Sequence, residues 1–426
     1  MSILSAESSG ELEPERVALA GLLRACEPPS AALVRYVQGH GPEAAWQAVL
    51  ARRAPRAVLS ATAARVDGVD PAVLVARAEA DLVAAARVGA RLIGPPDDQW
   101  PGAAVSAFAG AMARGVRGAG PPLGCRRTST ARVVTTGLPD RAVTVVGSRA
   151  SSPYGTRVAG EMAYELARAG SVVVSGAAFG IDTAAHRSAL QVVRSAPDEP
   201  RSVTVAVLAC GIDRAYPEAN RDLLDLIARH GSVVSEYPPG TVPARHRFLV
   251  RNRLIAAFGA ATVVVEAGRR SGTLSTAAAA EQLGRMVMAV PGPVTSAMSV
   301  GCHLLLADRF AQLVTGADDV LTALGRTGRT GRLESRALPG PHDGAVPGED
   351  PRHPTDGLEP TNARVYDAFP TRGSTSVHEL VVESGLPAAT VMGALAVLQL
   401  HGLADQDGPQ WRRVRPDRGT PPRQIG

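Results

Sequence analysis

The strongest concentration of chemically useful side chains lies between Thr241 and Arg253. These residues include four arginines and a phenylalanine but no acid, in a chain with an aromatic content of only 4%. Guanidinium groups pair with phosphates and an aromatic ring stacks on a base, so the combination suits single-stranded nucleic acid, although a solvent-exposed basic helix start is the alternative. Arginine in the first turn of a helix also opposes the helix dipole unless an anion lies nearby. The candidate phosphate contacts are Arg245, Arg251 and Arg253, and the candidate stacking ring is Phe248.

Three turns of small residues, each at the end of an apolar run, offer backbone N–H groups to an anion. The first turn also carries an arginine, which adds a cation to the candidate surface. Each turn has a simpler structural interpretation, because Ser, Thr and Gly also form tight strand-to-helix turns and helix N-caps. The candidate residues are Gly147, Ser148 and Arg149 in the first turn, Ser175 and Gly176 in the second, and Ser271, Gly272 and Thr273 in the third.

The composition excludes several classes of enzyme. The 426 residues include no lysine, which rules out a P-loop nucleotide site and any amine nucleophile. The four cysteines are far apart and have no histidine at metal-ligand spacing, which argues against a zinc site or a disulfide framework. The dinucleotide-binding glycine fingerprint is missing as well. We therefore expect no cofactor and no metal.

The charge balance and the N-terminus bear on partners and location. The net charge of +5 permits a polyanionic partner without requiring one. The N-terminal residues are acidic and lack the basic and apolar regions of a signal peptide, and no apolar run reaches the roughly 18 residues of a spanning helix. We expect a cytoplasmic protein that does not enter a membrane.

The candidate residues directly follow short apolar runs that are rich in β-branched side chains. Six such runs alternate with helix-length amphipathic stretches, which predicts an α/β fold with a mostly parallel sheet covered on both faces. Ligands of such sheets bind beyond the carboxyl ends of the strands. The predicted strands are 143–146, 172–174, 203–208, 233–234, 262–265 and 287–290.

The residues before this block fall into two parts. Residues 11–90 repeat apolar side chains at helical spacing, which predicts a small helical domain. Residues 91–135 are rich in Gly and Pro, and we expect an irregular lead-in to a sheet domain that spans 136–322.

The residues after the block also divide in two. Residues 323–357 combine Gly, Pro and charge with little to bury, which predicts a flexible linker. Residues 358–415 predict three small helices and a hairpin, the pattern of a winged helix. Its third helix, from Pro387 to Leu400, carries no basic residue, so protein contact or weak end-capping is expected in place of insertion into a DNA groove.

A series of motifs occurs in order from about Val143 to Val320. They read VGSRxxSxYG, SGxAxGIDxxAHxxAL, AxGxDxxYPxxN, SEYPPGTxPxxxxFxxRNRxIA, VVEAxxxSGxLxTAxxAxxxGR and a VPG turn. A series this long and specific does not arise by chance. Through these motifs, the central block resembles the DprA/Smf family of DNA-processing proteins.

The resemblance implies an extended Rossmann domain, preceded by SAM-like helices and followed by a winged helix. It further implies a protein without enzymatic activity that binds and protects single-stranded DNA, forms a homodimer through the Rossmann domain, and loads RecA recombinase during natural transformation. Arg245 stands where many relatives have Lys, a change that keeps the charge. The family's DNA contacts fall on Arg149, Arg245, Phe248, Arg251, Asn252 and Arg253.

Two other functions stay open at this point. A nucleotide hydrolase of the lysine-decarboxylase-like Rossmann group has a PGGxGT loop where this chain reads GRRSGT from Gly268 to Thr273, with only Glu266 as an acid beside it. Release of a base from nucleoside monophosphates would identify that enzyme. A sequence-specific regulator would act through the winged helix, and duplex probes compared with single-stranded ones would reveal it.

Overall fold

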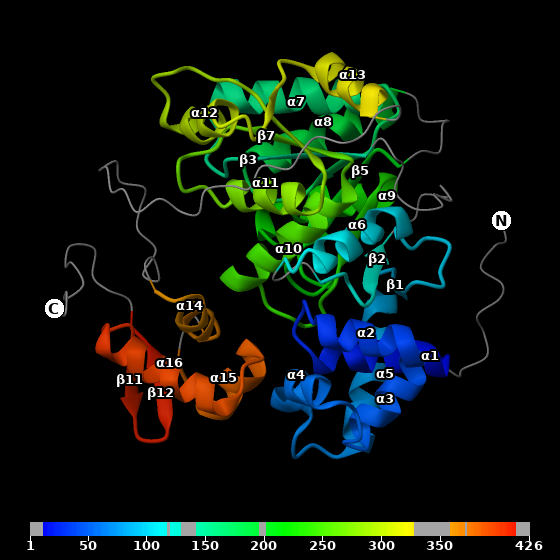
Figure 1. The fold of residues 1–426 in the computed structure, drawn as a ribbon, viewed down its shortest axis with the longest axis vertical. Coiled ribbons are helices and arrows are strands. Elements are labelled where there is room, and N and C mark those ends of the chain that lie inside the picture. Colours follow the sequence, from blue (N-terminus) through cyan, green and yellow to red (C-terminus); the bar gives the residue numbers. More distant parts are fainter. Residues whose placement is uncertain are drawn as a thin grey trace.

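The computed structural model describes residues 12–116, 120–128, 142–195, 202–327, 358–370 and 373–414. N-terminal helices, a central layered α/β part and a small C-terminal unit follow one another along the chain (Figure 1). The central sheet and its flanking helices occupy the upper part of the view in Figure 1. The N-terminal helices and the C-terminal unit lie side by side beneath them.

The N-terminal part is a cluster of helices around one hydrophobic core. Proline opens three of them, and the side chains of Ser30 and Asp70 cap two by accepting backbone hydrogen bonds. Trp46 packs so closely on Gly21 that a β-carbon at that position would lie 2.6 Å from the indole ring, so only glycine fits. The helices are α1 (Pro14–Ala25), α2 (Ala31–His40), α3 (Pro42–Leu50), α4 (Arg56–Val66) and α5 (Pro71–Arg87).

Seven parallel strands form the body of the central sheet: β3 (Val143–Gly147), β4 (Val173–Ser175), β5 (Thr204–Leu208), β6 (Ser232–Ser235), β7 (Ala261–Val265), β8 (Met286–Ala289) and β9 (Gln312–Leu313). The six predicted strands are confirmed to within one residue at each end, and β9 is additional. The spatial order is β6-β5-β4-β3-β7-β8-β9, so the direction of growth reverses between β3 and β7. In open α/β sheets the crevice at such a reversal, beyond the carboxyl ends, is the usual ligand site.

Helices cover both faces of this sheet, because successive strand residues point to opposite faces. Val145 packs into one hydrophobic cluster and its neighbour Val146 into the other. Two short 3₁₀ turns, Glu218–Asn220 and Ala297–Ser299, precede helices. One face is covered by α7 (Pro153–Arg168), α8 (Ile181–Ser195), α9 (Arg221–His230) and α13 (Ala317–Thr327), and the other by α6 (Gly102–Ala113), α10 (Arg245–Phe258), α11 (Thr273–Gln282) and α12 (Val300–Ala307).

The segment 91–135 is not the irregular lead-in that its Gly and Pro content predicts. Besides α6 it contributes to β1 (Ala90–Ile93) and β2 (Cys125–Thr128), which pair with each other in antiparallel fashion. Strand β2 also pairs antiparallel with β6 and so extends the sheet. Pairing with an existing sheet edge stabilises these short strands, a tertiary effect that local composition does not report. Residues 117–119 and 129–135 of the predicted lead-in lie outside the described residues.

The predicted linker 323–357 also begins later than expected. Helix α13 continues to Thr327, and its early turns pack against α7 through Val320 and Ala323. The remaining residues of that prediction, 328–357, lie outside the described part of the chain.

The C-terminal unit is a winged helix, as its sequence predicts. Its small sheet has the order β10-β12-β11 with antiparallel pairing, and β10 is a strand that the sequence did not indicate. Tyr366, Leu395 and Trp411 lie in its core. The elements are α14 (Pro360–Asp367), β10 (Ser374–Ser376), α15 (Val377–Ser384), α16 (Ala388–Leu400), β11 (Ala404–Asp407) and β12 (Gln410–Arg413).

Features of membrane and metal proteins were also sought in the described residues. Within them, no single helix is long and apolar enough to cross a membrane; only α15 and α16 taken together, at an angle of 107°, reach the required length and composition. The same residues hold no group of three or more His, Cys, Asp or Glu side chains that could bind a metal ion. The four cysteines are buried free thiols.

Candidate nucleic-acid interface

The first turn of small residues lies at the reversal point of the sheet, where β3 and β7 run side by side. A β-carbon on Gly147, the last residue of β3, would lie 1.9 Å from the Val265 carbonyl oxygen, so only glycine fits. The Ser148 N–H donates to the Glu266 carbonyl oxygen at 2.8 Å, and the Ser148 side chain is buried. The next side chain, that of Arg149, is exposed. The turn therefore brings one guanidinium group to the surface beyond the carboxyl ends of the strands.

Phe248, on α10, is the centre of a cluster of cations and rings. The Arg149 guanidinium carbon lies 5.1 Å from the centre of the Phe248 ring, and that of Arg251 lies 5.7 Å from it. The Tyr216 ring is centred 5.2 Å away and is inclined by 49°. Phe248 is half-buried, whereas Arg149 and Tyr216 are exposed. Part of a ring and a cation are thus open to solvent together, which is what base stacking beside a phosphate requires.

Arg251 supports this cluster from inside the protein. Its Nη1 donates to the carbonyl oxygens of Val207 and, at 2.9 Å, of Gly176. Burial lowers the pKa of Arg251 to about 10. A β-carbon on Gly176 would lie 2.5 Å from this Nη1, so the glycine makes room for the guanidinium group. Ser175 is also buried and donates to the Val145 carbonyl oxygen at 2.7 Å, so the second turn positions Arg251 and is not itself open to solvent.

Arg253 does not join the others at the surface. Its Nη2 donates to both carboxylate oxygens of Glu236, at 2.7 and 2.6 Å, and both side chains are buried. The Arg253 guanidinium carbon also lies 5.4 Å from the centre of the Phe108 ring on α6. A phosphate that drew Arg253 away from Glu236 would break a buried ion pair, at a cost of about 3–5 kcal/mol. Arg253 therefore holds α10 in place, and its contact with DNA stays a prediction.

The other two candidates on α10 differ in their surroundings. Arg245 is exposed in the first turn of α10, three residues before Phe248, so the two side chains leave the same side of the helix. Asn252 instead ties α10 to α11, because its Nδ2 donates to Ser275 Oγ at 2.8 Å. Of the α10 candidates, Arg245 and Phe248 thus remain on the side that faces solvent.

The third turn is held by its own side chains, but neither Ser271 nor Thr273 is the N-cap of α11, which is Gly272 and has no side-chain cap hydrogen bond. Ser271 Oγ accepts the Thr273 N–H at 3.2 Å, and Thr273 Oγ1 donates to the Gly147 carbonyl oxygen at 2.9 Å. These bonds fix the start of α11 against the end of β3. Gly272 is exposed, as are Arg269 and Arg270 just before the turn. The turn therefore lies beside the Gly147 turn, and the two exposed arginines precede it directly in the sequence.

Two aromatic residues that are not among the candidates above lie close to the cluster. Tyr216, after β5, is 40% exposed and contacts Phe248; Phe179, after β4, is 50% exposed. The neighbouring Gly180 has a φ of 73°, and a β-carbon there would lie 2.7 Å from the Arg149 carbonyl oxygen, so this loop packs on the Arg149 backbone. The sequence feature that points to Tyr216 and Phe179 as site residues is their position directly after predicted strands, in a chain that has few aromatic residues.

Glu266, the acid next to the third turn, is not an open acid or base. It is 3% exposed, and it accepts hydrogen bonds from the Ser152 N–H at 2.9 Å and from the Ser152 hydroxyl. A general acid or base must reach a substrate proton directly or through one water. The geometry therefore does not favour the nucleotide hydrolase alternative.

Comparisons with known proteins found two family models and several relatives that match the chain. A family model described as DNA recombination-mediator protein A matches residues 135–325, and a model of the DprA winged helix domain matches residues 349–408. The chain is 43% identical to a putative DNA processing protein DprA of Mycobacterium tuberculosis over 410 residues, which are 96% of this chain and 97% of the relative. It is also 43% identical to the DNA processing protein DprA of Streptococcus pneumoniae, over 42% of this chain and 60% of the relative. The X-ray structure of that S. pneumoniae protein aligns with a TM-score of 0.51 at 29% identity, covering 73% of this chain and 98% of the other.

Proposed function

The chain belongs to the DprA/Smf family of DNA processing proteins, and from that premise we propose that it binds single-stranded DNA across the carboxyl ends of its parallel strands. The family model describes a mediator of DNA recombination. In that role the protein protects incoming DNA and loads RecA recombinase onto it during natural transformation. The proposal includes a homodimer through the sheet domain, a cytoplasmic location and no enzymatic activity.

The observation that carries the proposal is the contact between Phe248 and Arg149. The half-buried ring has an exposed guanidinium group 5.1 Å from its centre and a buried one 5.7 Å from it. A base that stacks on this ring has its phosphate within reach of Arg149. Stacking contributes about 1–3 kcal/mol per base and tolerates any base, because every base has a π face.

The exposed cations define a path for the backbone of the strand. Arg149 lies at the reversal point of the sheet and Arg245 at the start of α10, with Phe248 on the same side of that helix. Two neutralised phosphates correspond to a slope of about −1.4 for log affinity against log salt, and each further contact adds about −0.7. Arg269 and Arg270 extend the exposed basic surface beyond the end of β7.

Fluorescence anisotropy of a labelled oligo-dT with the full chain tests the proposal. We expect the double variant Arg149→Ala/Phe248→Ala to lose most of the affinity, and an unlabelled duplex to compete poorly with the single strand. Arg77→Ala is the matched control, because it removes an exposed arginine from α5 and should leave the affinity unchanged. Equal binding by the double variant and the wild type would refute the proposed site.

The recombinase step needs its own assay. The rate of RecA filament assembly on oligo-dT coated with a single-strand-binding protein should rise when the full chain is added. The Arg149→Ala/Phe248→Ala variant should not produce this rise. An unchanged assembly rate with the wild-type chain would refute RecA loading while leaving DNA binding intact.

A further inference from the structure

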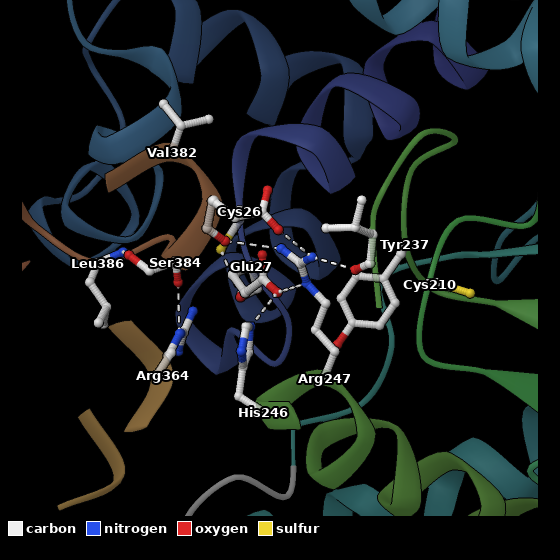
Figure 2. A network of polar contacts seen from close by, with 12 residues as sticks. Cys26, Glu27, Cys210, Tyr237, His246, Arg247, Arg364, Val382, Ser384 and Leu386 are labelled. Carbon is white, nitrogen blue, oxygen red and sulfur yellow. Dashed lines mark hydrogen bonds and ion pairs between the residues drawn. The ribbon is translucent and has the colours of Figure 1, made fainter. Parts of the chain in front are cut away.

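A buried network of ion pairs joins the three parts of the chain at the start of α10 (Figure 2). Glu27, which follows α1, accepts a hydrogen bond from Arg247 Nε at 2.9 Å and another from Arg65 of α4. His246 Nε2 lies 3.3 Å from the same carboxylate. Burial opposes ionisation of Glu27, yet the two arginines and His246 hold its pKa well below the usual range. A single carboxylate thus faces more than one cation, and the network needs further acceptors.

The winged helix supplies those acceptors from the end of α15. Arg247 Nη1 donates to the Glu383 carboxylate at 2.7 Å, and its Nη2 donates to the Glu383 carbonyl oxygen at 3.0 Å. Arg65 Nε donates to the Val382 carbonyl oxygen at 3.1 Å. Arg247 is only 1% exposed, so its buried guanidinium group depends on the winged helix for part of its hydrogen bonding. The C-terminal domain is therefore docked against α10 and α4 by specific polar contacts.

A second carboxylate of the winged helix lies at the end of α10 that carries the proposed DNA contacts. Asp367 is the last residue of α14, which packs against α10. Its carboxylate accepts a hydrogen bond from the backbone N–H of His246 and faces Arg245. Burial raises the pKa of Asp367 to about 6, while Arg245 and Arg413 oppose this rise. An anion therefore already occupies the place where the helix dipole and Arg245 favour one.

We propose that the winged helix and single-stranded DNA compete for the first turn of α10, so that the docked domain lowers the affinity of the chain for DNA. The inference rests on the proposed function. Asp367 makes the contacts that a phosphate would make, because it accepts from a helix N-terminal N–H and faces Arg245. A phosphate brought to Arg245 would meet this carboxylate, and the like charges would repel. Since α16 carries no basic residue, the docked domain offers DNA no compensating attraction along that helix.

Two substitutions in the full chain test the competition. Asp367→Asn removes the charge while keeping a hydrogen-bond acceptor, and we expect oligo-dT to bind about three- to tenfold more tightly, the range for one lost ion pair and one lost dipole contact. Glu383→Gln weakens a different contact that holds the winged helix against α10, and it should also make oligo-dT bind more tightly. The matched control is Asp405→Asn on the wing, an exposed carboxylate that pairs with Arg412 and should leave the affinity unchanged. Thermal unfolding of each variant confirms that it is folded.

Backbone hydrogen exchange supplies a readout of docking that does not depend on affinity. Saturating oligo-dT should speed exchange in α14 and α15 of the wild-type chain, because DNA displaces the domain. If oligo-dT binds but Asp367→Asn binds no more tightly, or exchange in α14 and α15 is unchanged, the competition is refuted and the proposed function stands. If the wild-type chain binds no oligo-dT at all, the proposed function fails and the competition fails with it.

Discussion

Arg149→Ala is the substitution whose effect follows most directly from the geometry. The side chain is exposed, is the cation nearest to Phe248 and lies at the reversal point of the sheet. Its removal takes away one charge-assisted hydrogen bond to phosphate, worth about 1.5–3 kcal/mol, whereas the cation–π contact with Phe248 already exists without DNA and adds nothing to this loss. Part of this is recovered by water and salt at the surface. We therefore expect a loss of about 1–2 kcal/mol, or roughly five- to thirtyfold in affinity.

The assay is a salt titration of oligo-dT binding followed by fluorescence anisotropy. With two exposed arginines at phosphates the wild-type slope should be at least about −1.4, and Arg149→Ala should reduce its magnitude by about 0.7. Arg149→Lys should keep the slope and lose only part of the affinity, because the charge remains while the planar guanidinium group is lost. A slope in Arg149→Ala identical to that of the wild type would show that Arg149 contacts no phosphate and would refute the reasoning.

Three further predictions concern other parts of the molecule. Tyr216→Ala or Phe179→Ala should weaken oligo-dT binding by about 1–3 kcal/mol for each base that loses a stacking partner; anisotropy at several salt concentrations should show an unchanged slope, and a reduced slope would contradict a stacking role. Arg253→Ala should lower the free energy of unfolding by about 3–5 kcal/mol, because the buried Glu236 carboxylate loses its partner; urea unfolding at wild-type stability would contradict this. Burial lowers the pKa of His186 from 6.5 to about 3, so the unfolded chain binds one more proton between these values and stability falls as the pH falls through that window. The wild-type free energy of unfolding should therefore fall more steeply than that of His186→Gln, by about 1.4 kcal/mol per pH unit, and equal slopes in urea titrations would contradict the assignment.

The parallel strands were predictable because their burial on both faces imposes apolar, β-branched runs. Val143 to Val146 and Thr262 to Val265 are of this kind, and both became strands at the expected positions. Strands β1, β2 and β9 were not, since their two to four residues include no run of apolar, β-branched side chains. Their stability depends on the neighbouring strand, which lies far away in the sequence.

The location of the candidate site was predictable from the sequence, but which of its arginines are buried and which are exposed was not. Arg251 and Arg253 belong to one motif and both turned out to be buried, the first against backbone carbonyl oxygens and the second against Glu236. Arg149, more than ninety residues earlier, is the one that reaches the surface beside Phe248. Spacing within a motif gives the order of side chains on a helix, whereas burial depends on partners that only the fold brings together.

The position of the winged helix could not be read from the sequence at all. Its docking depends on contacts of Arg247 with Glu27 and Glu383, which are 220 and 136 residues away in the sequence and meet it only in the folded chain. The absence of basic residues from α16 did indicate that this helix does not enter a DNA groove. What that domain contacts became visible only with the carboxylates of Glu383 and Asp367 at the start of α10.

Photocrosslinking locates the bound strand directly. The full chain would be irradiated with an oligonucleotide that carries iododeoxyuridine, and the linked peptides identified by mass spectrometry. If an unpaired strand lies over the carboxyl ends of the sheet, the linked residues will include Phe248 or Tyr216. Crosslinks confined to residues 388–400 of the winged helix would contradict the account.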